Sequence, residues 1–291
     1  QLRAHGLDET RLAISDNALR RIITSYTRES GVRQLERTVA ALCRKAARET
    51  VAGKEQVRVT VRLLEKYLGR PPYRTDEALR EDRVGVAHGL AYTQAGGSLM
   101  QVEVSAAPGK GNLTLTGQLG DVMKESAQAA YSYVRSRAEQ LGIDPSFYEN
   151  TDVHVHVPEG AVPKEGPSAG ITIALALASA LSGRKVRADV AMTGEITLTG
   201  RVLPVGGIKE KVLAAHRAGI ESVILPRENA ADIDEVPAAV RRRIEFRFVA
   251  HMDEVTALAL EPRTHAAEAV PLPPPGVVEA GESAAWAENA G

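Results

Sequence analysis

The sequence predicts an α+β fold with mixed sheets, in which a small helical part precedes a larger part that contains most of the strands. Alternation of apolar and polar residues, which is typical of half-buried strands, predicts the strand positions. Strands are expected at residues 84–93, 98–106, 113–116, 153–157, 189–192, 222–225 and 244–249. Segments with helical spacing separate the later strands, which indicates a mixed rather than a purely antiparallel sheet.

Residues 1–69 form the small helical part, because they carry repeated helix signals. Ser15 is a typical N-cap, and the apolar residues that follow G-V-R at 31–33 recur at helical spacing. These signals predict helices at 16–28, 31–46 and 61–68 and a short strand at 57–60. Residues 70–83 contain prolines and many charges, so we interpret them as a linker.

The larger part is expected to span residues 84–262. Besides the strands, it contains an amphipathic pattern at 121–141 that predicts one long helix. Glycines at 109–111 lie between two strand-like runs and predict a hairpin turn, since the G-x-x-x-x-G-K-[ST] spacing of a phosphate-binding loop is missing. Residues 263–291 are rich in Pro, Ala, Gly and Glu, which predicts a disordered tail.

The segment G-P-S-A-G at 166–170 places one small hydroxyl residue, Ser168, in a glycine-framed turn before the apolar run 171–181. The first amides of a helix have no intrahelical partner, and the helix dipole is positive there. If Ser168 attacked a carbonyl group, the resulting oxyanion would be stabilised at this place. Ser168 is an equally good helix N-cap, so this segment alone leaves a nucleophile and a structural serine open.

A second segment, V-G-G-I-K-E-K at 205–211, supplies a candidate base. Gly206 and Gly207 predict the start of a helix, and Gly219 predicts its end. Lys211 falls at the edge of the apolar face and within the first turn, where partial burial and the helix dipole both disfavour a positive charge. Both effects lower the pKa of a lysine toward neutrality, and a neutral lysine is a usable general base.

Two other interpretations stay open at this point. G-x-S-x-G is also the nucleophile elbow of α/β-hydrolases, and the chain order Ser168, Asp232, His251 suits a Ser–His–Asp triad, with His216 as another candidate histidine. That elbow needs a strand that runs directly into the turn, whereas about ten loop residues follow the strand at 153–157. The other interpretation is a non-catalytic module that oligomerises or docks partners and uses Ser168 only as a cap.

Three motifs resemble the protease domain of the bacterial ATP-dependent Lon proteases. They are P-K-E-G-P-S-A-G at 163–170, R-A-D-V-A-M-T-G-E-I-T at 187–197 and V-G-G-I-K-E-K at 205–211. The separation of Ser168 and Lys211 agrees with the Ser–Lys spacing of that family. The resemblance extends to about Pro262 and includes residues 1–69, which resemble the small α-subdomain of an AAA+ ATPase.

This resemblance implies a serine endopeptidase with a Ser168–Lys211 dyad, and it gives roles to further residues. Thr193 matches a family threonine whose hydroxyl lies near the catalytic lysine. The backbone amides of Ser168 and Ala169 would form the oxyanion hole. Glu165 stands where many family members have Asp, and we expect it to orient or gate the loop before the serine.

The resemblance also implies partners and cofactors. Arg33 matches the sensor-2 arginine that responds to the nucleotide γ-phosphate. Because no phosphate-binding loop is found and the chain starts with Gln1, we expect a fragment that lacks the ATPase core and neither hydrolyses ATP nor binds it tightly. We expect the full-length protein to form a homo-hexamer that uses ATP and Mg to degrade unfolded or damaged polypeptides. Peptide-bond chemistry itself needs no cofactor. Contact with DNA is possible in the full-length family, but no pattern in this chain indicates it.

Charge, cysteine content and hydropathy bear on whether the protein binds nucleic acid, contains a disulfide or spans a membrane. Lys and Arg number 36 against 37 Asp and Glu, so the totals indicate no nucleic-acid-binding patch. The single cysteine, Cys43, allows no internal disulfide and suits the reducing cytoplasm. The longest apolar run, about eleven residues, is too short to span a bilayer. His154 and His156 share one side of a strand, but no further ligand motif accompanies them, so no metal site is expected.

Overall fold

The structure, a computed structural model, describes residues 1–73, 78–93, 96–158 and 164–262. Helices and mixed sheets make up an α+β fold, as the sequence predicts. Two groups of elements, one within residues 1–68 and one within 83–259, each bury hydrophobic clusters of their own. The tail predicted at 263–291 lies outside the described residues.

The N-terminal elements build a small core around one long helix. In chain order they are η1 (Arg3–His5), β1 (Leu12–Ile14), α1 (Asp16–Ser25), α2 (Arg33–Val51), β2 (Val57–Val59) and α3 (Val61–Leu68). The apolar face of α2 buries Leu42, Cys43 and Ala46 in one core with β1 and β2, which pair in parallel. Ser15 caps α1 as predicted, since its hydroxyl accepts the Ala18 amide at 3.3 Å.

Helix α1 ends at Ser25 rather than near Arg28, where the sequence predicts its end. The Thr27 hydroxyl donates to the Ile23 carbonyl at 2.8 Å, and this carbonyl is the acceptor that a further helical amide would use. Tyr26 is buried, and its hydroxyl donates to a carbonyl at the end of α3 at 2.9 Å. Side-chain hydrogen bonds therefore replace another helical turn.

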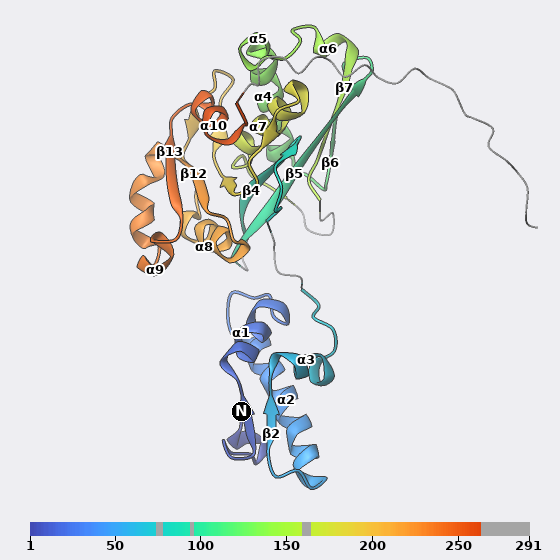
Figure 1. The fold of residues 1–291 in the computed structure, drawn as a ribbon, viewed down its shortest axis with the longest axis vertical. Helices are drawn as coiled ribbons and strands as arrows, with labels where there is room; N and C mark the ends of the chain where they lie inside the picture. Colours follow the sequence, from blue (N-terminus) through green and yellow to red (C-terminus); the bar gives the residue numbers. More distant parts are fainter. Residues whose placement is uncertain (74–77, 94–95, 159–163, 263–291) are drawn as a thin grey trace, which may run out of the picture. The chain divides into compact units, whose positions relative to one another are not determined.

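The larger part is organised around a sheet in which the described strands have the order β13-β12-β9-β4-β5-β7-β6 (Figure 1). These strands are β4 (Val86–Thr93), β5 (Gly96–Pro108), β6 (Leu113–Thr116), β7 (Thr151–His156), β9 (Val190–Met192), β12 (Ser222–Pro226) and β13 (Glu245–Val249). The pairs β4–β5 and β5–β7 are antiparallel, and the other pairs are parallel. Two short ladders join β3 (Arg83–Val84) to β8 (Lys185–Val186) and β10 (Glu195–Ile196) to β11 (Val202–Leu203).

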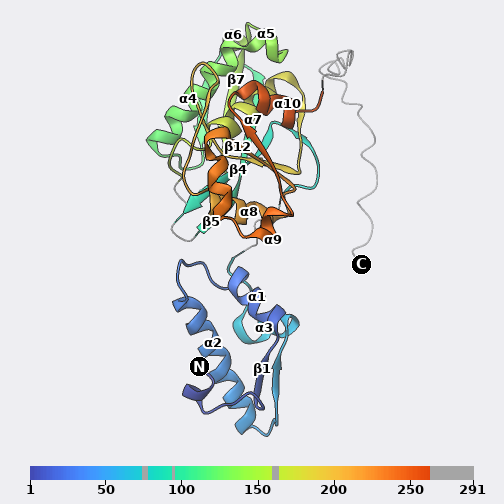
Figure 2. The same cartoon turned by 90° about the vertical axis from the view of Figure 1, so that its left-hand side faces the viewer.

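Helices pack on both faces of this sheet (Figure 2). They are α4 (Asp121–Ser136), α5 (Ala138–Leu141), α6 (Phe147–Asn150), α7 (Gly170–Ser182), α8 (Ile208–Ala218), η2 (Arg227–Glu235), α9 (Ala238–Arg241) and α10 (Met252–Ala259). Helices α4, α7 and α10 share one hydrophobic core, and α8 with η2 forms the other. The alternation of β12 divides its side chains between them: Ile224 belongs to the α7 core, and Val223 and Leu225 belong to the α8 core. Within the described ranges, no helix is both long and apolar enough to cross a membrane.

Two sequence predictions in this part are wrong in detail. The glycine turn after β5 is not a hairpin, because β6 pairs in parallel with β7, which lies between β5 and β6. The Asp152 carboxylate on β7 accepts the backbone amides of Lys110 and Asn112, both at 2.8 Å, and so holds the loop across the end of β7. The helix predicted at 121–141 is divided into α4 and α5 at Arg137, where the backbone leaves helical geometry (φ −115°, ψ 15°).

Candidate active site

Ser168 lies in the turn that leads into helix α7. Gly166, two residues before Ser168, has φ of 98°, a left-handed conformation in which a side chain is strained. The Gly170 amide donates to the Pro167 carbonyl at 3.1 Å and closes the turn, and Ala169 is the N-cap of α7. Ser168 itself is partly exposed to solvent.

Thr193 and Gly194 hold the backbone of Ser168 against the end of strand β9. The Gly194 amide donates to the Ser168 carbonyl at 2.9 Å, and the Thr193 hydroxyl donates to the same oxygen at 3.1 Å. Thr193 directly follows β9 and is fully buried. Both lone pairs of the Ser168 carbonyl are therefore engaged, and the sheet fixes the position of the serine backbone.

Lys211 lies in the first turn of α8, and only 2% of its surface is exposed. Its Nζ donates to Thr193 Oγ1 at 3.0 Å. Because the single Thr193 proton is directed at the Ser168 carbonyl, Thr193 accepts from the lysine and does not donate to it. A neutral Lys211 amine therefore keeps its lone pair and a second N–H for another partner.

Burial lowers the pKa of Lys211 from 10.5 to about 8, because an apolar environment solvates the ammonium ion poorly. Ile208, Val212 and Ala215 on the same helix belong to the surrounding core. The sequence places Lys211 at the edge of this face, whereas in the structure it is as buried as the apolar residues beside it. Lys209, in the same turn of the helix, is exposed.

The backbone amides of Ser168 and Ala169 are candidate donors to an oxyanion. In the part of the chain that the structure describes, neither amide donates a hydrogen bond to another protein group. Both precede the first turn of α7, where the helix dipole is positive. Preorganised donors beside a nucleophile are what stabilises the negative oxygen formed in acyl transfer.

Glu165 and Arg33, the other predicted residues, lie at the starts of two different helices. The Glu165 carboxylate accepts the Val122 amide, in the first turn of α4, at 3.1 Å. Arg33 is exposed as the first residue of α2. The carboxylate of Glu29 accepts two backbone amides of the same α2 turn at 2.8 and 2.9 Å.

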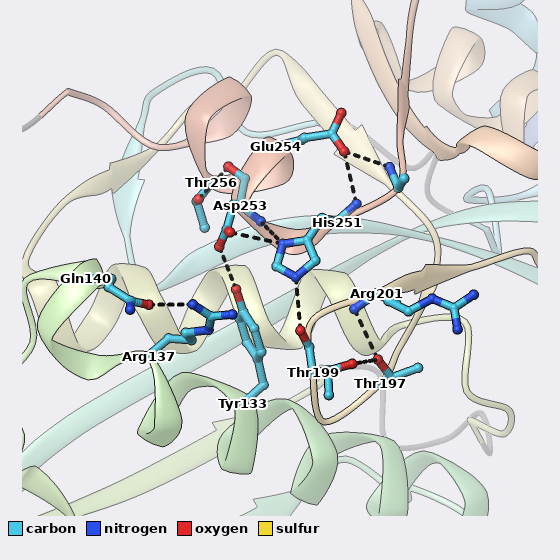
Figure 3. Close-up of polar contacts among 11 residues, drawn as sticks. Tyr133, Arg137, Gln140, Thr197, Thr199, Arg201, His251, Asp253, Glu254 and Thr256 are labelled. Atoms are coloured by element: carbon cyan, nitrogen blue, oxygen red, sulfur yellow. Dashed lines mark hydrogen bonds and ion pairs between the residues drawn. The ribbon is translucent and has the colours of Figure 1, made fainter.

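The residues of the alternative Ser–His–Asp triad have other partners. His251 caps α10, its Nε2 is hydrogen-bonded to a carbonyl in the β10–β11 loop at 2.9 Å, and its Nδ1 lies 3.1 Å from the Asp253 carboxylate (Figure 3). Asp232 accepts the side-chain amide of Asn229 at 2.6 Å. Among the hydrogen bonds of the described residues, none joins Asp232, His251 and Ser168. His216, the other candidate, lies in the last turn of α8.

His251 belongs instead to a polar cluster that no local sequence pattern indicates (Figure 3). The Tyr133 hydroxyl donates to Asp253 at 2.9 Å, and burial raises the pKa of Tyr133. Gly200 has φ of 87°, and a Cβ on it would lie 2.7 Å from the His251 ring. The cluster anchors the β10–β11 loop, which follows Thr193 in the chain. The glycine in T-L-T-G-R is a sequence signal for a turn, but it does not identify these partners.

Among the residues that the structure describes, the two strand histidines belong to no cluster of metal ligands. His154 and His156 lie on the same side of β7, as the alternation predicts, and each contacts the Thr116 hydroxyl of β6 at 2.7 Å. Within the ranges that the structure describes, no group of three or more His, Cys, Asp or Glu side chains could hold a metal ion. Cys43 is buried and forms no disulfide.

Comparison with known proteins matches nearly the whole described chain. Residues 58–262 match a family model described as the Lon protease (S16) C-terminal proteolytic domain, and residues 3–59 match the Lon protease AAA+ ATPase lid domain. Over 261 residues, identity is 57% to Lon protease of Desulforamulus reducens, 60% to Lon protease of Heliobacterium modesticaldum and 56% to Lon protease 1 of Bacillus subtilis. Each alignment covers 89% of this chain but 32%, 32% and 34% of the relative, so the chain spans about a third of their length.

Proposed function

Because the chain belongs to the Lon protease family, we propose that it cleaves peptide bonds with Ser168 as the nucleophile and Lys211 as the general base. The observation that carries this proposal is a chain of two hydrogen bonds, from Lys211 to Thr193 at 3.0 Å and from Thr193 to the Ser168 carbonyl at 3.1 Å. It ties a buried lysine with a lowered pKa to the residue whose proton it would accept.

In the acylation step, neutral Lys211 accepts the hydroxyl proton of Ser168 while Oγ attacks the carbonyl carbon of the scissile bond. With a pKa of about 8, roughly a tenth of the lysine is neutral at pH 7. Thr193 accepts one N–H of the amine and thereby orients its lone pair. The oxyanion forms beside the amides of Ser168 and Ala169, which supply hydrogen bonds that strengthen as charge develops.

The intermediate collapses when the Lys211 ammonium donates its proton to the leaving amine and the C–N bond breaks. This leaves an ester between Ser168 Oγ and the acyl part of the substrate. A water molecule then attacks the ester, Lys211 accepts its proton, and the proton returns to Oγ as the C–O bond breaks. The proton balance therefore closes between Ser168 and Lys211.

For the full-length protein we propose a homo-hexamer that uses ATP and Mg to deliver unfolded polypeptides to this site in the cytoplasm. The match of residues 3–59 to an ATPase lid supports the coupling to nucleotide. Arg33, exposed at the start of α2, would sense the nucleotide held by an ATPase core. The present chain contains no phosphate-binding G-x-x-x-x-G-K-[ST] segment, so peptide cleavage is the activity to test on it.

The test is cleavage of an unstructured fluorogenic peptide, without nucleotide, by wild type and three variants. Ser168→Ala and Lys211→Met should both abolish cleavage, because each removes one partner of the proton transfer. Lys209→Met is the matched control, since it removes an exposed lysine from the same helical turn and should leave the rate unchanged. Cleavage that survives Lys211→Met would contradict the assigned base and return attention to the histidines.

A further inference from the structure

The β10–β11 hairpin, residues 195–203, connects the two segments that carry the proposed catalytic machinery. Thr193 and Gly194, which both bond to the Ser168 carbonyl, directly precede it. On its other side, a short turn leads into α8, which carries Lys211 in its first turn. A displacement of the hairpin therefore changes the support of the serine backbone and the position of the lysine together.

The hairpin has little pairing of its own. Two residue pairs join β10 to β11, and in the described sheets these strands pair only with each other and not with the seven-stranded sheet. An isolated two-stranded hairpin is marginally stable in water. Contacts with other elements must therefore hold the hairpin in its place between the two proposed catalytic residues.

The segment that leads into α10 supplies such contacts at the tip of the hairpin (Figure 3). Two backbone hydrogen bonds, of 2.8 and 2.9 Å, join residues 250–252 to Gly200 and Val202. Between these two bonds, Nε2 of His251 lies 2.9 Å from the Thr199 carbonyl oxygen. Because a carbonyl oxygen can only accept, Nε2 carries the proton and donates it, whatever the charge of the ring. A side chain therefore completes the attachment of the hairpin to the start of α10.

The ring of His251 is itself held by α10, by α4 and by the hairpin. Its Nδ1 accepts the Asp253 amide at 3.2 Å, which makes the ring the N-cap of α10. The Asp253 carboxylate lies 3.1 Å from Nδ1 and accepts the hydroxyl of Tyr133, on α4, at 2.9 Å. A Cβ on Gly200 would lie 2.7 Å from Nε2, so the backbone of the hairpin packs directly against the ring. These contacts fix the direction in which Nε2 donates.

We propose that His251 is a positioning residue for the reaction: by donating to the Thr199 carbonyl, it fixes the β10–β11 hairpin and thereby the spacing of the two catalytic residues. This inference rests on the proposed function of Ser168 and Lys211. Among the described residues, His251 makes no hydrogen bond to either of them, so it acts through the hairpin alone. The role differs from that of the histidine in a Ser–His–Asp triad, because no proton moves to or from the ring.

Two substitutions separate the two hydrogen bonds of the ring. His251→Asn places an amide oxygen near the position of Nδ1, so α10 keeps an N-cap, but its side chain is too short to donate to Thr199. His251→Gln places its amide nitrogen near the position of Nε2 and keeps that donor, but it loses the cap. Each variant lacks one hydrogen bond, so both should lower the Tm by a similar amount. Leu198→Ala is the matched control, because it shortens a side chain that is 63% exposed in the same hairpin and leaves both bonds in place.

The readouts are the rate at which a fluorophosphonate probe labels Ser168 at several pH values, the Tm, and hydrogen exchange of the Gly194 amide, which bonds to the Ser168 carbonyl. His251→Asn should slow labelling roughly 10- to 100-fold and accelerate this exchange. His251→Gln should label and exchange as the wild type does despite its lowered Tm. The pH at which labelling is half-maximal should stay the same in both variants, because Lys211 remains the base. Leu198→Ala should match the wild type in every readout.

An equal loss of labelling in the Asn and Gln variants would overturn the proposal, because reactivity would then follow stability alone. Labelling and Gly194 exchange at wild-type rates in His251→Asn would overturn it as well. So would a shifted pH midpoint in His251→Asn, since the ring would then take part in proton transfer. If the wild type itself is not labelled, the proposed function has failed, and exchange of the Gly194 amide alone then decides whether His251 holds the hairpin. The failures of the two proposals are therefore distinguishable.

Discussion

Replacing Lys211 with Met should make the folded protein more stable at neutral pH, although it removes the proposed base. Only 2% of Lys211 is exposed, and burial lowers its pKa from 10.5 to about 8. Below pH 8 the folded state keeps an ammonium ion in an apolar core, whereas the unfolded chain holds the same ion in water. Methionine is of similar length and fills the same space without a charge.

The size of the effect follows from the difference in pKa. Each pKa unit corresponds to about 1.4 kcal/mol, so the shift from 10.5 to about 8 destabilises the folded state by on the order of 3 kcal/mol below the lowered pKa. Loss of the hydrogen bond to Thr193 offsets about 1 kcal/mol of this gain. We therefore expect Lys211→Met to raise the free energy of unfolding by about 2 kcal/mol at pH 7.

The advantage of the variant should disappear as the pH rises. Between pH 8 and 10.5 the unfolded lysine binds a proton that the folded lysine does not, so wild-type stability increases with pH in this window. At about 1.4 kcal/mol for each pH unit, the two proteins should be equally stable near pH 9.5. Urea titrations followed by circular dichroism at several pH values between 7 and 9.5 measure this convergence.

Lys209→Met controls for the loss of a lysine, and because Lys209 is exposed its effect should stay within about 0.5 kcal/mol at every pH. A Lys211→Met protein that is less stable than wild type at pH 7 would refute the reasoning. A stability difference that stays constant from pH 7 to 9.5 would refute it equally, because the lysine would then not titrate in this window.

Three further predictions concern the same region. The kcat/KM for an unstructured peptide should rise about tenfold per pH unit below about pH 8 and level off above it, since only the neutral lysine is a base, and a flat profile would count against this. Thr172→Val should raise the free energy of unfolding by on the order of 1 kcal/mol and keep activity, because the buried Thr172 hydroxyl has no partner within the described residues. Thr193→Val should lose both stability and activity, because the Thr193 hydroxyl bonds to the Ser168 carbonyl and to Lys211. Gly200→Ala should destabilise by about 2 kcal/mol or more, seen as a lowered Tm, because φ is 87° and the new Cβ would lie 2.7 Å from the His251 ring; an unchanged Tm would argue against the close packing of this loop.

Much of the local structure could be predicted because its signals lie within a few residues of one another. Gly207 and Gly219 predict the ends of α8, and the structure confirms the helix between them, with both glycines in left-handed conformations. Ser15 predicts the start of α1 for the same reason, since an N-cap acts within its own turn. The position of Lys211 in the first turn of α8 follows from the same local pattern.

The structural features that could not be predicted depend on contacts between segments that are distant in the sequence. In the order β5-β7-β6, the loop after β5 crosses the end of β7, where its amides donate to Asp152, a residue about 40 positions later in the chain. Strand β1 has three residues and becomes recognisable only through its pairing with β2. The Glu165 carboxylate occupies the space where a Cβ on Gly120, just before α4, would lie. In the sequence, this contact is reflected only by the presence of glycine at that position. Local periodicity carries no information about such partners.

The Thr172 hydroxyl, which has no partner within the described residues, shows a cost of the site to helix α7. A buried helical threonine ordinarily donates to a carbonyl three or four residues earlier. For Thr172 the carbonyl four residues earlier is that of Ser168, which already accepts from Thr193 and Gly194. Both lone pairs of this oxygen are thus committed to the end of β9. The carbonyl three residues earlier, that of Ala169, accepts the Ile173 amide. Among the described residues, the Thr172 hydroxyl has no hydrogen-bond partner. The same carbonyl cannot satisfy the Thr172 hydroxyl of its own helix and also connect the proposed nucleophile, through Thr193, to the buried lysine; in this structure it does the second.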